Sequence, residues 1–121
     1  MPISTQEFQK AVLRLGDALK QEKNEFIRDS VIQRFEFCVE LAWKTAKKLM
    51  GTQTTAPKQV VREMIQNDLI ENVEIWLQAI DERNNSSHTY NEELAEKVYT
   101  FIVIFYPDLE KLVLKFNSYE N

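Results

Sequence analysis

The sequence predicts an all-α protein, and three observations support that class. Two glycines and three prolines among 121 residues are too few for a turn-rich β protein. Apolar residues recur at steps of three and four along most of the chain, which is the spacing of one helical face. The composition, 44% apolar and 28% charged, is that of an ordinary globular domain. We expect a single domain, 1–121, folded as an up-and-down antiparallel bundle of four main helices plus short extra helices.

The first half of the chain should form two helices. The apolar repeat that begins at Phe8 predicts a first helix over about residues 5–21. After a short polar connection, a long second helix should reach Met50 and stop at Gly51, because glycine favours the left-handed conformation that ends helices. Its main apolar seam has a regular three-and-four spacing and consists of Ile32, Phe35, Val39, Ala42, Ala46 and Leu49.

The second helix also carries apolar residues outside that seam. Phe37 and Leu41 lie more than about 100° from its centre when each residue turns the helix by 100°. A surface helix usually has one apolar stripe. This helix is therefore either the central helix of the bundle or part of a subunit interface, which Trp43 and Phe37 could anchor.

The second half should add a short helix that begins at Pro57, a helix marked by the apolar run 73–80, and a fifth helix that begins at Tyr90 and has its apolar residues from Leu94 onward. We expect Pro107 to end this fifth helix, because its ring removes a backbone donor and restricts the preceding residue. A last helix should follow over 109–116.

Charge and cysteine content exclude several classes of protein. The net charge of −4, from 15 basic and 19 acidic residues, argues against coating of nucleic acid by bulk electrostatics, so any RNA contact must be local. Cys38 is the only cysteine, which excludes an internal disulfide and leaves too few ligands for a zinc site. No signal peptide and no apolar run of about 20 residues is present. We expect a cytoplasmic protein with no metal, no cofactor and no membrane contact.

The segment between the fourth and fifth helices holds the only histidine. Arg83 and His88 would lie about 140° apart on a continuous helix, so they converge only if the helix breaks between them. The polar run 84–87 favours such a break, and Thr89 with Glu92 resembles a capping box at the start of the next helix. Arginine, histidine and a helix N-terminus together could bind a phosphate and transfer protons. A turn histidine beside a solvated arginine is the plainer alternative.

The spacing Arg83, four residues, His88, one residue, Tyr90 resembles the R-x4-H-x-Y motif of the HEPN superfamily of small helical proteins. The motif belongs to the HepT-like branch, whose members are paired with minimal nucleotidyltransferases. Blocks at 28–37, 40–44 and 57–63 are similar to those of the subgroup called nucleotidyltransferase substrate-binding proteins. The resemblance therefore extends over nearly the whole chain.

This resemblance implies a metal-independent endoribonuclease, the toxin of a toxin-antitoxin pair, often dimeric with the motif residues facing a composite cleft. Arg83 would hold the phosphate, and His88 would act as general base or acid. Asn84 would position the RNA strand. The partner nucleotidyltransferase would silence the site by attaching AMP to Tyr90.

A second interpretation is a non-catalytic subunit that binds a nucleotide or other substrate for the nucleotidyltransferase. The stretch 85–87 is more polar than in the toxin branch, which favours this alternative. Arg28, in one of the similar blocks, would contact the substrate or pair with a carboxylate. The chain lacks the Gly-Ser step and paired aspartates of a nucleotidyltransferase, so it would be that enzyme's partner, as a homodimer or hetero-oligomer. A purely structural helper, working through the Phe37 face, is a third possibility.

Overall fold

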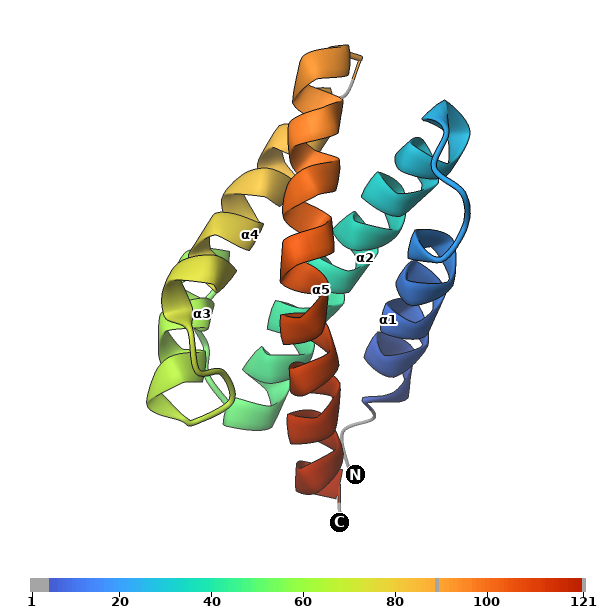
Figure 1. Ribbon diagram of the computed structural model, residues 1–121. Coiled ribbons are helices and arrows are strands. Elements are labelled where there is room, and N and C mark those ends of the chain that lie inside the picture. The colour runs from blue at the N-terminus through green and yellow to red at the C-terminus, as the bar shows by residue number, and fades with distance from the viewer. Residues whose placement is uncertain (1–4, 89, 121) are drawn as a thin grey trace.

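Helices make up almost all of the computed structural model, which describes residues 5–88 and 90–120. The elements follow the order α1 (Gln6–Leu19), α2 (Glu25–Met50), α3 (Pro57–Gln66), α4 (Val73–Asn85), the short 3₁₀ helix η1 (Ser86–His88) and α5 (Glu92–Glu120). Figure 1 shows α5 running the length of the bundle, with α1 on one side and α3 and α4 on the other. The all-α bundle expected from the sequence is confirmed.

The ends of the first three helices lie close to the predicted positions. Asn24 caps α2, because its side-chain oxygen accepts a hydrogen bond from the Ile27 backbone N–H at 2.8 Å. Gly51 ends the same helix in the left-handed conformation, with φ of 67°. Pro57 is the first residue of α3, where its missing N–H has no helical partner to lose.

The long helix α2 is the centre of the bundle. It packs against α1, α3, α4, η1 and α5, as expected for a central helix, but Phe37 remains 54% exposed, so this packing does not fully cover the second apolar face. The core around it is rich in aromatic side chains. Phe35 and Trp76 each meet Phe105 edge to face, and Phe8 meets Phe116 in the same way. Each such pair adds about 0.5 to 1.5 kcal/mol beyond the area it buries, so these contacts tie α1, α2 and α4 to α5.

Cys38 lies on the buried side of α2 and is 0% exposed. Removal from water disfavours the charged thiolate, and this raises the pKa of the Cys38 thiol to about 12.

Over the part of the chain that the structure describes, no helix combines the length and apolar character needed to cross a membrane.

The prediction that Pro107 ends the fifth helix is wrong. One continuous helix, α5, runs from Glu92 to Glu120 with Pro107 inside it. Phe105 and Leu109, on either side of the proline, are both fully buried. A break in the helix at Pro107 would remove half of the apolar face of α5 from the core. The proline itself is exposed, and so is Val103, whose carbonyl loses its helical donor and can bond to water instead. The burial of these side chains therefore outweighs the free energy lost with the helical hydrogen bond at Pro107.

Replacing Pro107 by alanine should therefore stabilise the protein. The substitution restores the missing hydrogen bond and removes the ring clash, which together cost up to about 3 kcal/mol in a helix interior. Thermal unfolding followed by circular dichroism should show a higher midpoint. An unchanged or lower midpoint would mean that the ring makes contacts that offset this cost.

The helices α1 and α5 approach each other closely at Gly16. The Tyr106 hydroxyl donates a hydrogen bond to the Val12 carbonyl at 3.3 Å and lies directly over this glycine. A Cβ atom at position 16 would stand only 2.2 Å from the tyrosine hydroxyl oxygen. The glycine is therefore what allows the tyrosine to reach the backbone of α1.

Candidate functional site

The junction between α4 and α5 breaks the helix close to where the sequence predicted a break. The α-helix continues through Asn85, and the next three residues form the tighter helix η1. The Ser86 hydroxyl donates to the Arg83 carbonyl at 2.6 Å, and the Ser87 hydroxyl donates to the Asn84 carbonyl at 3.0 Å. These side chains compete with the backbone, as expected for serine. The break begins at Ser86 rather than at Asn84.

Asn91 caps α5. Its side-chain oxygen accepts from the Leu94 N–H at 3.1 Å, and its own N–H donates to the His88 carbonyl at 3.2 Å. The capping role predicted for Thr89 lies outside the described residues. Glu92 and Glu93 occupy the first turn of α5, so carboxylates already complement the positive end of this helix.

Arg83 points toward α2. Its Nε atom lies 2.8 Å from Oε1 of Glu40, and Lys44 approaches the other carboxylate oxygen of Glu40 at 3.5 Å. The N–H of that nitrogen is not aligned with the oxygen, so the contact is an ion pair rather than a directed hydrogen bond. The Arg83 side chain is one-third exposed, although its Nε atom is buried against α2.

His88 and Tyr90 lie side by side in solvent. Both residues are exposed, and their rings meet edge to face with centroids 6.0 Å apart. Asn84 is exposed on the last turn of α4. Among residues 5–88 and 90–120, no hydrogen bond, ion pair or ring contact joins Arg83 to His88. The fold thus brings histidine and tyrosine together, whereas the arginine faces a carboxylate on another helix.

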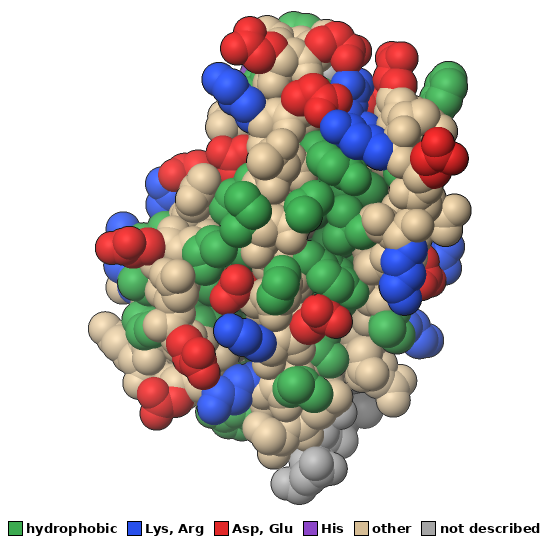
Figure 2. Space-filling view, in the orientation of Figure 1, with side chains coloured by type: hydrophobic (Ala, Val, Ile, Leu, Met, Phe, Trp, Pro, Cys, Tyr) green, Lys and Arg blue, Asp and Glu red, His purple; other side chains and the backbone are tan. Residues whose placement is uncertain are grey.

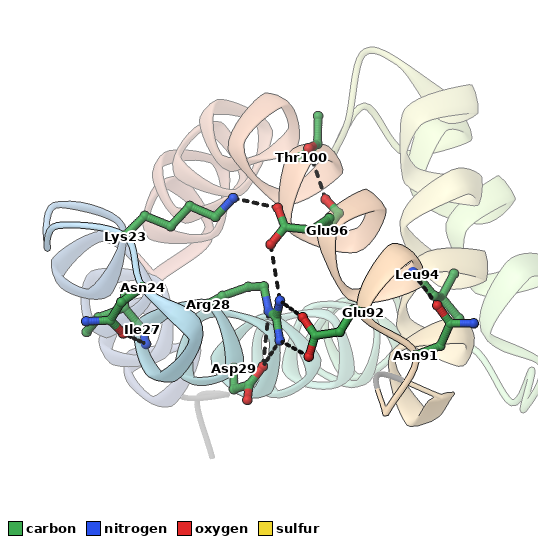
Figure 3. A network of polar contacts seen from close by, with 10 residues as sticks. All are labelled: Lys23, Asn24, Ile27, Arg28, Asp29, Asn91, Glu92, Leu94, Glu96 and Thr100. Atoms are coloured by element: carbon green, nitrogen blue, oxygen red, sulfur yellow. Dashed lines mark hydrogen bonds and ion pairs between the residues drawn. The ribbon is translucent and has the colours of Figure 1, made fainter.

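Arg28 is the centre of the polar network in Figure 3, which joins the start of α2 to the start of α5. Its side chain is only 5% exposed. One guanidinium nitrogen contacts Glu92 at 2.6 Å and Glu96 at 3.1 Å, and a second contacts Asp29 at 3.2 Å. Lys23 pairs with the same Glu96. The carboxylate pairing considered from the sequence is present.

The network shifts the pKa values of its members in the directions that stabilise ion pairs. The hydrogen bonding of the Arg28 guanidinium to the Glu92 carboxylate is the main cause that raises the pKa of Arg28 above its ordinary value. That same bond lowers the pKa of the Glu92 carboxyl, and the bond from Lys23, followed by that from Arg28, lowers the pKa of Glu96. Sequence reasoning missed both glutamates, because they lie 64 and 68 residues from Arg28.

These shifts predict how stability depends on pH. A carboxyl whose folded pKa lies below its unfolded value of about 4.3 stabilises the fold above that pH, and the contribution is lost as the pH falls through the folded value. The unfolding midpoint of the wild type should therefore drop as the pH falls below the unfolded value and through the lower folded values. The paired variant Glu92→Gln/Glu96→Gln should show a smaller drop. Equal pH dependence in both proteins would contradict a stabilising role for these two carboxylates.

The arrangement is an exposed histidine beside a tyrosine, at a helix junction of an all-α bundle. The family model described as "Nucleotidyltransferase substrate binding protein like" matches residues 4–118. The chain therefore belongs to this family, and the resemblance to HEPN proteins of the HepT type is confirmed. Over the described residues, no group of three or more histidine, cysteine, aspartate or glutamate side chains gathers as a metal site would require.

Individual relatives agree with this assignment. The chain is 34% identical over 79 residues to the "Probable ribonuclease HepT" of Haemophilus influenzae, a match that spans 59% of this chain and 54% of that relative. A solved Thermus thermophilus structure is 27% identical with a TM-score of 0.77, and a solved Haemophilus influenzae structure is 24% identical with a TM-score of 0.84. Each of these two matches covers 94% of this chain and 99% of the chain in the solved structure. The last is described as the fold of a substrate binding domain of a nucleotidyltransferase and supports the fold.

Proposed function

We propose that this chain is the partner subunit of a minimal nucleotidyltransferase and the metal-independent endoribonuclease toxin of a toxin-antitoxin pair. The observation that carries the proposal is the position of all three motif residues around one helix junction. His88 and Tyr90 are open to solvent, and Arg83 is partly open in the last turn of the preceding helix. The similarity to a probable ribonuclease supports the same activity.

The proposed reaction is a transfer of the phosphate within the RNA. His88 takes the proton from the ribose 2′-hydroxyl, whose oxygen then attacks the adjacent phosphorus, and the bond from phosphorus to the 5′-oxygen breaks. Arg83 binds the phosphate oxygens as negative charge develops on them, and Asn84 positions the strand. A protonated histidine returns a proton to the leaving oxygen. The products are a 2′,3′-cyclic phosphate and a 5′-hydroxyl end.

One histidine per chain makes a two-copy site the simplest arrangement. The base and the acid then come from the His88 residues of two protomers across a composite cleft, and Arg83 of one copy can reach the phosphate held beside His88 of the other. The lack of contact between these side chains within the described chain supports this arrangement. We therefore propose a homodimer as the active form.

Modification of Tyr90 is suited to inhibit RNA cleavage. Its ring packs against His88, so an AMP group attached to the phenol oxygen by the nucleotidyltransferase would place a bulky anion beside the imidazole. That anion would repel the phosphate of RNA and occupy its space. We propose that Arg28 influences the same region from a distance, because its pairs with Glu92 and Glu96 hold the first turns of α5.

A non-catalytic subunit that binds a nucleotide for the nucleotidyltransferase is the second candidate. Two carboxylates in the first turn of α5 favour it, because Glu92 and Glu93 would oppose a long polyanion near the junction more than a single nucleotide. The same three motif residues would then bind without turnover.

Incubation of the purified protein with unstructured RNA in excess EDTA separates the two candidates. The ribonuclease should produce ends with cyclic phosphate while the chelator is present. Binding of a nucleotide in equilibrium dialysis, with intact RNA at every protein concentration, would favour the adaptor and overturn the nuclease.

A further inference from the structure

The groove between α1 and α2 holds a group of cationic side chains that the fold leaves without carboxylate partners. Lys10 and Arg14 make no ion pair with any described residue, and Arg34 has only a hydrogen bond of 3.2 Å to the Ser30 hydroxyl. In contrast, the arginine at the start of α2 and the arginine of the motif are both paired with carboxylates. In a chain with a net charge of −4, unpaired cations that gather in one groove indicate an anionic ligand.

The groove consists of two adjoining hollows that share Arg14 and Arg34. One hollow also contains Lys10, Phe37 and Leu41, and the other extends past Asp17. Phe37 is 54% exposed, so one side of its ring is open to solvent next to the arginines. Glu7 and Asp17 are the carboxylates that line the two hollows, against the three cations.

We infer that this groove binds a single-stranded segment of RNA, an inference that rests on the proposed ribonuclease function and adds a substrate-binding surface to it. The arginines and the lysine hold successive phosphates, and a base stacks on the open side of Phe37. Cations that follow the backbone and an aromatic platform for bases are the two elements by which proteins bind single strands without reading their sequence. The contact is local, as a protein of net negative charge requires.

The same face fits a second copy of this chain less well. A two-fold contact would bring Arg14 and Arg34 of one copy close to the same residues of the other, and like charges at short range are unfavourable. A polyanion instead neutralises each of these cations.

The groove also lies close to the motif along α2. Phe37 and Glu40 are three residues apart and are therefore neighbours on the helix surface. Glu40 holds Arg83, so a strand stacked on Phe37 can continue directly to the motif arginine. The groove thus forms the approach of the RNA to the cleavage site.

Fluorescence anisotropy with a labelled, unstructured RNA of about ten nucleotides tests the inference, with site sizes of this order typical for single strands. All variants carry His88→Ala so that the RNA stays intact. Arg14→Gln/Arg34→Gln should weaken binding by roughly tenfold or more and reduce the slope of log affinity against log salt by about 1.4, since each lost phosphate contact on a single strand contributes about 0.7. Phe37→Leu should weaken binding roughly tenfold with the slope unchanged.

Arg62→Gln is the matched control, because Arg62 is an exposed arginine on α3, away from the groove. It should leave affinity and salt slope nearly unchanged. If the groove variants bind RNA like this control, the inference is overturned. It is also overturned if Phe37→Leu halves the mass measured by light scattering while RNA binding stays intact, since the face then joins two copies. Groove-dependent binding without cleavage by the wild type would instead support the groove and overturn the nuclease.

Discussion

Replacing His88 by alanine should slow RNA cleavage by roughly 10²- to 10⁴-fold, the usual contribution of a general acid-base group. The imidazole is exposed beside Tyr90 and is the only histidine in the chain, so no other imidazole can take over the proton transfer. Single-turnover cleavage of a labelled RNA at saturating protein measures the effect on the chemical step. Since His88 is at the surface, the unfolding midpoint should stay the same, which separates lost chemistry from lost folding.

Arg83→Ala should reduce the same rate constant by roughly 10²- to 10³-fold, as the loss of one group that stabilises developing charge does. Arg83→Lys keeps the charge and loses the planar fork, so it should recover only part of the rate. Glu40→Gln tests the ion pair separately, because it releases Arg83 without removing it. Full activity in both alanine variants, at positions 83 and 88, would contradict the assignment of this motif as a catalytic site.

Gly16→Val should destabilise the protein, because it overpacks the contact between α1 and Tyr106. The added Cβ would lie 2.2 Å from the Tyr106 hydroxyl oxygen and 3.0 Å from the ring carbon that bears it, so the tyrosine must move and lose its bond to the Val12 carbonyl. Overpacking of this kind costs about 1 to 3 kcal/mol, which lowers the unfolding midpoint by up to roughly 10 °C in a domain of this size. Thermal and urea unfolding measure both quantities.

The double variant Gly16→Val/Tyr106→Phe gives the control for this prediction. Removing the hydroxyl relieves the shortest contact, so the glycine substitution should cost less in the phenylalanine background than in the wild type. Equal costs in both backgrounds would show that the close approach of Tyr106 is not the reason that position 16 is glycine.

The sequence was sufficient to predict most of the helices, because their apolar spacing and their end signals are local. The error at Pro107 has a clear cause. The rule that proline ends a helix takes account only of the hydrogen bond lost within that helix. The burial of Phe105 and Leu109, which flank Pro107, depends on packing against the other helices. No feature of the local sequence shows which of these contributions is larger.

The candidate site was predictable in its residues but not in their partners. The spacing of Arg83, His88 and Tyr90 is visible in the sequence, and so are the polar residues that end α4. The carboxylate that holds Arg83 and those that hold Arg28 come from other helices, distant along the chain. Which residues pair depends on how each helix is rotated about its axis in the bundle. The spacing of residues within one helix does not determine this rotation.

Because Cys38 is buried, the rate at which a thiol reagent labels it reports local unfolding of the protein. A maleimide at neutral pH reacts with thiolates that it can reach, and a thiol that is 0% exposed, with its pKa raised to about 12, satisfies neither condition in the folded state. Alkylation of the single cysteine should therefore proceed only from molecules in which α2 has come away from its neighbours. The labelling rate then reports these openings without any engineered cysteine.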